Sequence, residues 1–545
     1  MVGPPIPPTL GALLAPGTRA VAPRRPVAPP MRGAGLYSRQ AIRLQCRSHH
    51  GSLITSRLSP SAGLHRRPFT SSTPTAAGLE GAKAAPKKES DSDSTASTAS
   101  TAGTLDGSHP QSPSPATESS GFDWEDQPNF QIKKFTELPY TNFGVNQHMI
   151  INQELKEALR QLLWRFRAPI RYAFAYGSGV FPQSTGSTAT EAEVKAVHPR
   201  APLAVQRAQD GSPKMIDFIF GVSHTQHWHS LNLMQHRDHY SMLGSLGSAA
   251  VTAVQDKWGA GVYFNPYVTI DGILIKYGVV NINTLCRDLA EWDTLYVAGR
   301  LHKPVKILRD DPRVRLANQI NLLSALRTAL LLLPPTFTEQ ELYATIAGIS
   351  YLGDPRMRFP TENPKKVSNI VNHNMLNFRR LYAPLVEALP NVVYDDPACS
   401  DPDWIENAGS VLKLQQDMNP IKRGNMVRRL PKAFRAKLYF EYQKKFQIPQ
   451  LEFDKMMEES KNEDANSFKR QQGGGFEQRI AQDAPESLRS HVRDVIKKTI
   501  NWPGTTQSIK SFFTAGVRRS VRYLSEKVSK YREGGGAERD DEKFP

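Results

Sequence analysis

The sequence predicts a mixed α/β (α+β) domain followed by a mainly helical region, and three observations support this. Apolar runs of strand length occur at Tyr172–Tyr176, Met215–Val222, Gly261–Ile270 and Ile273–Val280. Apolar residues at helical spacing precede the first run, over residues 150–167. After residue 312 the apolar residues recur mainly with helical periods. Strands mixed with flanking helices indicate a layered α/β domain, and 545 residues leave room for two to four domains.

The first 79 residues have the composition of a mitochondrial presequence. They contain ten arginines, no lysine and no acid, and arginine-rich, acid-poor N-termini with serines are typical of transit peptides. A merely disordered basic tail is the alternative. Residues 80–127 are a linker rich in Ser, Thr, Pro, Ala and Gly, with too little apolar content to offset the entropy lost on ordering, so we expect this linker to be disordered.

Charge and cysteine content narrow the function classes. The formal net charge of +17 invites a nucleic-acid interpretation, but residues 1–79 supply +10 of it. No basic groove interleaved with aromatic residues is visible elsewhere, which disfavours nucleic acid as a partner. The three cysteines, Cys46, Cys286 and Cys399, are too few for a disulfide framework and fit a reduced compartment such as the mitochondrial matrix.

A Gly-Ser-Gly turn follows the first predicted strand. Tyr172–Tyr176 leads directly into Gly177, Ser178 and Gly179. Glycine permits backbone conformations that are closed to other residues. Successive backbone N–H groups at such a turn, together with the Ser178 hydroxyl, form a concavity suited to phosphate. A tight turn without a ligand is the commoner meaning of such a tripeptide, so the turn alone is weak evidence.

Two charged residues interrupt later predicted strands. Asp217 stands in an otherwise apolar run, where a carboxylate is costly unless it is paired or binds a cation. It is therefore the first candidate ligand for Mg²⁺, and a partly exposed edge-strand acid is the alternative. Lys276 stands in Ile273–Val280 and points either outward to solvent or towards phosphate. Residues 184–213 are polar without a clear period and are expected to be an inserted surface loop.

Helices dominate the rest of the sequence. The predicted helices are Arg315–Leu333, one that opens with a capping box at Thr338 and Glu341, Val367–Leu389, Ala484–Asn501 and Ser508–Arg532, with a loop at Lys455–Gly475. No apolar stretch reaches the about 20 residues that span a bilayer. No transmembrane segment is therefore expected, and a lipid would be met from the membrane surface.

The last predicted helix is amphipathic. One side carries Ile509, Phe512, Phe513, Val517, Val521, Leu524, Val528 and Tyr531, and the other carries Lys510, Arg518, Arg519, Arg522, Lys527, Lys530 and Arg532. A basic and apolar helix with phenylalanines is typical of one that lies in an anionic membrane interface. Packing of this helix on the protein's own core is the alternative.

These motifs occur together in an order that resembles a known family. Besides the blocks around Gly177 and Asp217, the matching blocks are Trp228–Asn232, His239–Ser241, Gly259–Asn265, Ile275–Val279, Asp288–Trp292, Leu295–Lys306 and Ile509–Gly516. Together they resemble the mitochondrial CDP-diacylglycerol synthases, also called mitochondrial translocator assembly and maintenance proteins. The resemblance runs from about Phe130 to about Tyr394 and returns near the C-terminus.

The resemblance implies a domain order and an activity. It implies a DNA polymerase beta-like nucleotidyltransferase domain at 128–311, a helical, winged-helix-like domain at 312–395, helices with loops at 396–503, a membrane-associating helix at 504–533 and a disordered tail at 534–545. The implied activity is that of a Mg²⁺-dependent phosphatidate cytidylyltransferase, which makes CDP-diacylglycerol and pyrophosphate from CTP and phosphatidic acid. Such an enzyme would be peripheral to the matrix face of the mitochondrial inner membrane and would feed cardiolipin synthesis.

Two other functions stay open beside this one. The first is a non-catalytic assembly or tethering factor for an inner-membrane translocase, and the second is a nucleotidyltransferase that acts on RNA. The tethering hypothesis has some support, because Ile219 stands where this superfamily usually places a second acid.

The resemblance also implies site residues. Those for CTP and phosphate are Tyr176, Gly177, Ser178, Gly179, Lys276, Arg300 and Lys303; the metal ligands are Asp217 and Asp288; the catalytic residues are Asp217, Lys276 and Asp288; and the membrane contacts are Phe512, Phe513, Arg518, Arg519 and Arg522. Asp288 could instead cap a helix or pair with a cation. The five histidines at 224, 227, 229, 236 and 239 have no cysteine nearby and no zinc spacing, so His229 and His239 are expected to orient residues near the cytidine pocket.

Overall fold

A mixed sheet of strand order β3-β4-β2-β1-β5 organises the part of the chain that contains the candidate site. Its strands are β1 (Tyr172–Tyr176), β2 (Ile216–Val222), β3 (Val262–Ile270), β4 (Ile273–Asn281) and β5 (Lys306–Arg309). β2 runs parallel to β4, whereas β1 is antiparallel to both β2 and β5, and β3 and β4 form a hairpin. The four predicted strands are confirmed, and the short β5 is a fifth strand that was not predicted.

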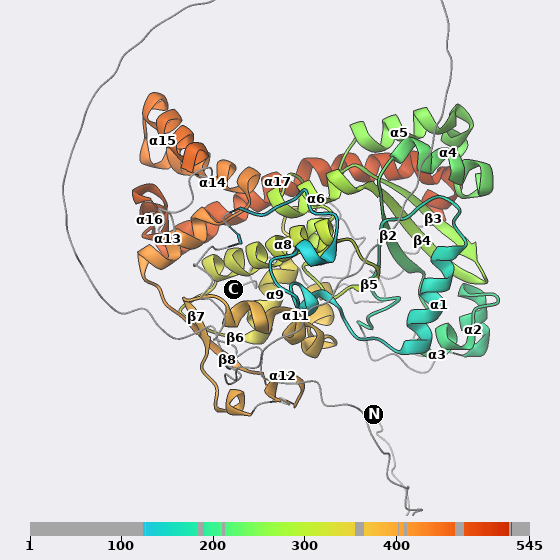
Figure 1. The fold of residues 1–545 in the computed structure, drawn as a ribbon, viewed down its shortest axis with the longest axis horizontal. Helices are drawn as coiled ribbons and strands as arrows, with labels where there is room; N and C mark the ends of the chain where they lie inside the picture. The colour runs from blue at the N-terminus through green and yellow to red at the C-terminus, as the bar shows by residue number, and fades with distance from the viewer. Residues whose placement is uncertain are drawn as a thin grey trace, which may run out of the picture. The chain divides into compact units, whose positions relative to one another are not determined.

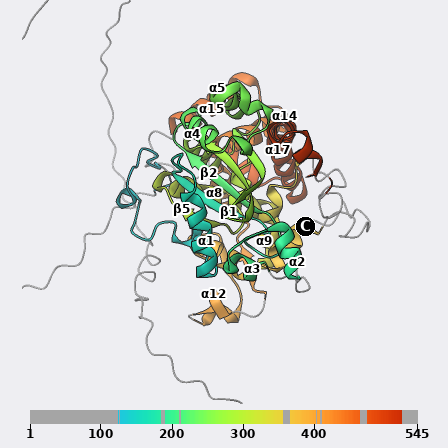
Figure 2. The ribbon, with the colours of Figure 1, turned by 90° about the vertical axis from the view of Figure 1, so that its right-hand side faces the viewer.

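The structure, a computed structural model, describes residues 124–125, 127–183, 190–209, 213–354, 365–401, 403–407, 411–463, 474–522 and 525 (Figures 1 and 2). All of them belong to one compact unit, Ser112–Pro545. The predicted presequence, nearly all of the predicted linker and the predicted C-terminal tail lie outside the described residues. No described helix has both the length and the apolar character needed to cross a membrane.

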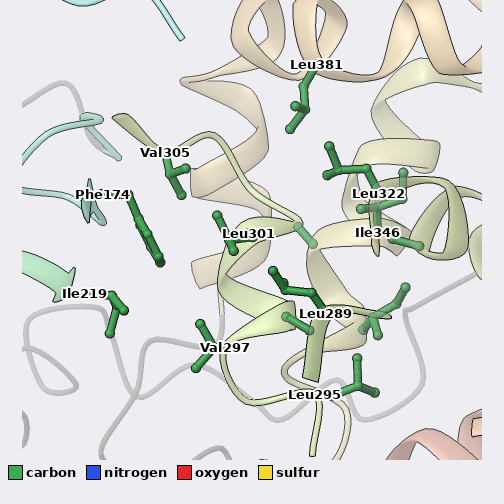
Figure 3. Packing of buried hydrophobic residues seen from close by; sticks show 14 of the residues in the cluster. Phe174, Ile219, Leu289, Leu295, Val297, Leu301, Val305, Leu322, Ile346 and Leu381 are labelled. Atoms are coloured by element: carbon green, nitrogen blue, oxygen red, sulfur yellow. The ribbon is translucent and has the colours of Figure 1, made fainter. Parts of the chain in front are cut away.

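The two faces of this sheet are covered by different helices. α4 (Thr225–Gln235) and α5 (Gly247–Lys257) lie together on one face (Figure 1). There Phe220 of β2 stacks on Tyr277 of β4, with ring centroids 5.3 Å apart. The other face is covered by α6 (Ile282–Glu291) and α7 (Ala298–Leu301). Figure 3 shows Phe174 and Ile219 of this second face directed towards Val297 and Leu301.

A long buried helix, α8 (Pro312–Leu332), joins the sheet region to the helices that follow. Asp311 caps it by accepting from the backbone N–H groups of Arg313 and Val314, and Pro312 occupies the first turn, where no N–H is needed. Nearly every residue of α8 is buried, so the apolar cluster around it is continuous from α1 (Gln153–Trp164) to α17 (Pro485–Ala515). The predicted regions 128–311, 312–395 and 396–503 therefore share one core.

The region after α8 contains helices and a small sheet. β6 (Thr336–Thr338), β8 (Lys413–Gln416) and β7 (Val392–Tyr394) pair in that order. The predicted capping box is confirmed, because Thr338 and Glu341 bond reciprocally at the start of α9. Further helices are α1 (Gln153–Trp164), α9 (Glu339–Ile349), α12 (Trp404–Asn407), α13 (Pro420–Arg428), α14 (Lys432–Phe446) and α16 (Gly475–Ala481).

Five predicted elements differ from the structure, and four of them are described first. Residues 184–213 contain two helices, α2 (Glu191–Val197) and α3 (Leu203–Ala208), and the former has its own capping box at Thr190 and Glu193. The predicted helix 367–389 is two helices, α10 (Lys366–Asn372) and α11 (Met375–Glu387). The predicted loop 455–475 begins inside α15 (Gln450–Glu463). The predicted helix 484–501 belongs to a longer helix, α17 (Pro485–Ala515).

α17 continues through Pro503, a residue that usually ends a helix. It packs on α8, α14 and β3. Before Pro503, Thr499 accepts from Lys437 of α14, and after it Gln507 donates to the Val262 carbonyl of β3, so tertiary contacts hold both halves in one line. The predicted helix 508–532 is therefore not a separate element. It is broken instead at Gly516, whose φ of +81° suits glycine, and helix resumes over residues 517–522. Residues 523, 524 and 526–532 lie outside the described residues.

Candidate active site

Tyr176, Asp217 and Lys276 lie side by side on three adjacent strands. Tyr176 of β1 pairs in register with Asp217 of β2, and Asp217 pairs with Lys276 of β4. Residues that pair in this way project from the same face of a sheet. Lys276 Nζ is 3.5 Å from Asp217 Oδ1, and the two side chains are 17% and 28% exposed. A ligand can therefore reach this pair at the edge of the core.

The Gly-Ser-Gly turn lies against Asp217. Gly177 has a φ of +80°, and its carbonyl accepts from the backbone N–H groups of Val180 and Phe181 at 3.1 and 2.9 Å. A Cβ on Gly177 would lie 3.4 Å from Asp217 Oδ2, and one on Gly179 would lie 2.9 Å from the Met215 carbonyl. Both glycines are thus required by the geometry, one by its φ and the other by close packing.

Asp217 has the character expected of a cation ligand. Its Oδ1 is buried, makes no hydrogen bond and has the ammonium of Lys276 as its neighbour at 3.5 Å. Ile219, two residues along the same face, is fully buried, and a Cβ on Gly278 would come within 2.9 Å of it. No acid can replace it there without disturbing the core. Mg²⁺ is commonly held by one or two carboxylates together with substrate phosphates, and Asp217 fits that use.

Both carboxylate oxygens of Asp288 accept hydrogen bonds from the loop that follows it. Its Oδ1 accepts from the backbone N–H and hydroxyl of Thr294 at 2.9 and 2.7 Å, and its Oδ2 accepts from the N–H groups of Val297 and Ala298 at 2.9 and 3.0 Å. These bonds use both oxygens and fix the loop that enters α7. The geometry thus favours the capping alternative over the predicted metal-ligand and catalytic roles of Asp288.

Arg300 extends the site from α7. Its Nε donates to the Tyr176 hydroxyl at 3.3 Å, and its guanidinium lies 4.1 Å from the ring centroid of Tyr296. The same guanidinium is 5.9 Å from the ring centroid of Phe264, and Lys276 Nζ is 4.8 Å from that ring. Arg300, Lys276 and Asp217 therefore belong to one cluster around Tyr176.

Lys303 lies further along, beside the second helical region. Its Nζ donates to the Gly299 carbonyl and to the Ser350 hydroxyl, and it lies 5.0 Å from the ring centroid of Tyr351. Lys366 Nζ lies 5.3 Å from the same ring. Burial, together with the positive charges of Arg300 and Lys366, lowers the pKa of Lys303 to about 7. Three cations thus converge where an anion would relieve their repulsion.

Sequence reasoning missed Lys366 and Tyr351. They lie 60 and more residues beyond the strands of the site, and only the packing of α9 and α10 brings them to Lys303. The one available signal was the Lys365–Lys366 pair at the start of a predicted helix, which by itself is typical of a solvated surface.

We expect anion binding near Lys303 to take up a proton. With a pKa of about 7, most Lys303 side chains are neutral at pH 8, and a bound polyphosphate would raise that pKa. Calorimetric titration with CTP at pH 8, in two buffers of different ionisation enthalpy, measures the proton uptake. Lys303→Arg keeps the charge but does not titrate in this range, so the uptake should disappear in that variant. Equal uptake by both proteins would contradict the placement of CTP here.

The histidines lie elsewhere. His239 Nδ1 and Asn232 bond the Tyr277 hydroxyl, and His229 bonds Tyr240 and Gln255, all within 3.0 Å and buried. Tyr277 follows Lys276 on β4, so this network occupies the sheet face opposite Asp217. Burial lowers the pKa values of His229 and His239 to about 4, which keeps both rings neutral. His229 and His239 therefore hold Tyr240, Gln255 and Tyr277 on the sheet face opposite Asp217, and their place beside a cytidine pocket stays a prediction.

Within the described residues, one group of possible metal donors is His236, Asp238 and His239. The two imidazole rings stack in parallel, 4.3 Å apart with an interplanar angle of 5°. Nitrogen lone pairs lie in the ring planes, so two parallel stacked rings cannot both point at one ion. His302 is also structural, because it is buried and its Nε2 lies 2.9 Å from Asn321 Oδ1.

A glycine turn, the Asp217–Lys276 pair and converging cations lie together here, and their chemistry suits a phosphate-bearing ligand. Comparison with known proteins identifies the family of the chain. The family described as mitochondrial phosphatidate cytidylyltransferase matches residues 159–530. The chain is 38% identical to the phosphatidate cytidylyltransferase, mitochondrial, of Xenopus laevis over 68% of this chain and 93% of the relative. Identity to the protein of that name from Schizosaccharomyces pombe is 36% over 71% of this chain and 86% of the relative.

A third relative is the protein of the same name from Saccharomyces cerevisiae, which is 42% identical over 46% of this chain and 60% of the relative. The chain therefore belongs to the mitochondrial phosphatidate cytidylyltransferase family.

Proposed function

We propose that the protein is a mitochondrial phosphatidate cytidylyltransferase that converts CTP and phosphatidic acid into CDP-diacylglycerol and pyrophosphate. The observation that carries this proposal is the Gly177 turn, which lies directly against the Asp217–Lys276 pair. Family membership supports the substrates, since the relatives are named for this reaction. The proposed place of action is the matrix face of the inner membrane, and the proposed domain types are a nucleotidyltransferase domain followed by a winged-helix-like one.

In the proposed mechanism a phosphate oxygen of phosphatidic acid attacks the α-phosphorus of CTP. The bond from that phosphorus to the β-phosphate oxygen breaks, and pyrophosphate leaves. The N–H groups of the turn and the Ser178 hydroxyl would hold the leaving phosphates, while Lys276, Arg300 and Lys303 offset their charge. Asp217 would hold Mg²⁺, which supplies charge neutralisation at the phosphates. The protein forms no covalent bond, so positioning and electrostatics provide the acceleration.

The end of α17 supports contact with lipid, because its polar side faces the protein and its apolar side faces outward. Gln507, Lys510 and Thr514 are at most 1% exposed, whereas Ile509, Phe512 and Phe513 are 53, 46 and 59% exposed. A helix that packed only on its own core would have the opposite orientation. Outward phenylalanines fit an interfacial helix.

Two basic residues, one on α17 and one on the helical turn after Gly516, have structural roles instead of the predicted surface ones. Lys510 is buried and donates to the carbonyls of Gln255 and Trp258 at 3.1 and 2.5 Å, at the end of α5. Arg519 donates to the carbonyls of Asp238 and His239 at 2.8 and 2.9 Å. Arg518 and Arg522 are exposed, as contact with anionic headgroups requires, and Arg522 lies 4.6 Å from the Tyr267 ring centroid.

A second exposed apolar segment adjoins the end of α17. Ser241 Oγ donates to the Phe513 carbonyl at 3.0 Å and begins the short helix η4 (Met242–Leu246). Met242 and Leu246 are 88% and 71% exposed. We include both in the proposed lipid-facing surface.

Replacing Phe512 and Phe513 together by serine should abolish binding to anionic vesicles while CTP binding is retained. Both side chains are exposed, so the loss of apolar insertion is expected without loss of folding. Vesicle flotation measures the binding. Leu203→Ser is the matched control, because Leu203 is 65% exposed on α3, remote in sequence from α17. Truncation at residue 505 is less informative, since it also removes the buried Gln507 and Lys510. Unchanged flotation of the double variant would count against this surface.

The reaction itself is tested with purified protein lacking residues 1–79. Incubation with CTP, Mg²⁺ and phosphatidic acid vesicles should release pyrophosphate and CDP-diacylglycerol in equal amounts, and chelation of Mg²⁺ should stop both. A protein that binds CTP and vesicles but releases neither product would support the non-catalytic tethering function.

A further inference from the structure

The segment that contains α2 and α3 joins two parts of the candidate site. It lies between β1 and β2 in the chain, and α3 rests against α1 (Figures 1 and 2). Its polar composition predicts a surface loop, yet two of its residues, His198 and Gln209, are 1% and 4% exposed. Buried polar side chains are retained where their hydrogen bonds are satisfied, and the partners of these two are informative.

Gln209 holds the Gly-Ser-Gly turn. Its Nε2 donates to the Gly179 carbonyl at 2.8 Å. Its Oε1 accepts from the Lys214 N–H at 2.6 Å, just before β2, and lies 3.0 Å from His198 Nε2. One side-chain amide therefore connects the turn, the start of the Asp217 strand and His198.

His198 holds the strand that carries Lys276. Its Nδ1 accepts from the Leu274 N–H at 3.0 Å, and Leu274 lies two residues before Lys276 on β4. Because Nδ1 accepts, the proton is on Nε2, which donates to Gln209 and to the Lys214 carbonyl. Burial lowers the pKa of His198, and this favours the neutral ring that the bonds require.

The same segment packs directly on the β3–β4 turn. Gly272, at the tip of that turn, has a φ of +77°, and a Cβ there would lie 2.3 Å from the Arg200 carbonyl carbon. The backbone around residue 200 thus touches the hairpin, and no larger residue fits between the two. The β3–β4 hairpin is therefore connected to the Gly-Ser-Gly turn by a continuous series of contacts through Arg200, His198 and Gln209.

We propose that Gln209 and His198 are positioning residues that hold the Gly177–Gly179 turn in register with the strand of Lys276. Neither touches the substrate. Through them the N–H groups of the turn and the lysine of β4 meet one triphosphate at a fixed separation. The expected change in KM for CTP rests on the proposed function. The positioning of the turn by Gln209 and His198, called the clamp below, can be tested without measuring activity.

The test compares Gln209→Ala and Gln209→Met with the full-length protein. Methionine nearly preserves the side-chain volume, so it removes the hydrogen bonds without leaving a cavity. Both variants should raise KM for CTP about tenfold or more, because removing a buried partner leaves the Gly179 carbonyl unsatisfied. KM for phosphatidic acid should stay unchanged. The control is Gln206→Ala, since Gln206 lies on α3, which ends just before Gln209, but donates to the Ala201 carbonyl. Its kinetics should match the wild type.

A second readout does not depend on activity. Hydrogen exchange of a peptide covering residues 177–183 should be faster in both Gln209 variants than in the wild type and in Gln206→Ala. A KM for CTP within twofold of the wild type with unchanged exchange would overturn the proposal. A similar fall in kcat in both Gln209 variants, with both KM values unchanged, would also overturn the proposal, because a smaller folded fraction of the protein produces that result. If the wild type makes no CDP-diacylglycerol but the exchange effect appears, the clamp stands and the proposed function fails.

Discussion

Asp217→Asn is expected to lower the rate of CDP-diacylglycerol formation at least about a hundredfold in a protein that stays folded. The buried Oδ1 of Asp217 has no hydrogen-bond partner, and asparagine has nearly the same shape, so the packing of β2 should be retained. The neutral amide neither offsets Lys276 nor holds Mg²⁺, and the loss of a key electrostatic group at a reacting phosphate has this magnitude.

The measurement is the initial rate of pyrophosphate release at saturating CTP and Mg²⁺, with circular dichroism to confirm folding. Asp293→Asn is the matched control, because Asp293 forms its ion pair with Arg287, at 2.6 Å, and not with a residue of the proposed site. This variant should leave the rate near that of the wild type. Substantial Mg²⁺-dependent activity in Asp217→Asn would place the cation on other residues.

Gly177→Val should abolish activity. A β-branched residue is strongly disfavoured at the φ of +80° found there. Its side chain would also fill the space between the turn and the Asp217 carboxylate, 3.4 Å from the position of the new Cβ. We therefore expect both CTP binding and turnover to fall below detection.

Equilibrium binding of CTP and the rate of pyrophosphate release test this expectation. The control is Gly475→Val, since a Cβ on Gly475 meets nothing within 4 Å. Near-normal turnover by Gly177→Val would show that the phosphates bind away from the turn.

The individual residues of the turn and of the strands could be predicted as site residues from the sequence. The contacts between them, which depend on the tertiary fold, could not. Gly177 stands out because it begins a glycine-containing turn directly after an apolar strand. Asp217 stands out because it is an acid in an apolar run. The register of Asp217 with Lys276 depends on the parallel pairing of β2 with β4 across a connection that contains two α-helices, two short 3-10 helices and a strand. No spacing rule specifies that pairing.

The errors have a common cause, which is that tertiary contacts override local signals. Pro503 predicts a helix end, yet packing on α8, α14 and β3 carries α17 past it. Asp288 reads equally well as a ligand or a cap, and only the positions of Thr294, Val297 and Ala298 decide between them. The polar segment 184–213 contains helices because its few buried residues contact distant strands.

The position of the Asp217–Lys276 pair on interior strands of the five-stranded sheet has a consequence for how the protein loses function. Both strands have neighbours on each side, and such strands exchange their amide protons mainly through global opening. The pair also joins chain segments far apart in sequence, so it cannot survive as a local remnant once the sheet separates. With the site assigned as proposed, opening of the sheet removes the whole site at once, so a partly unfolded population of this protein contains no partly active molecules.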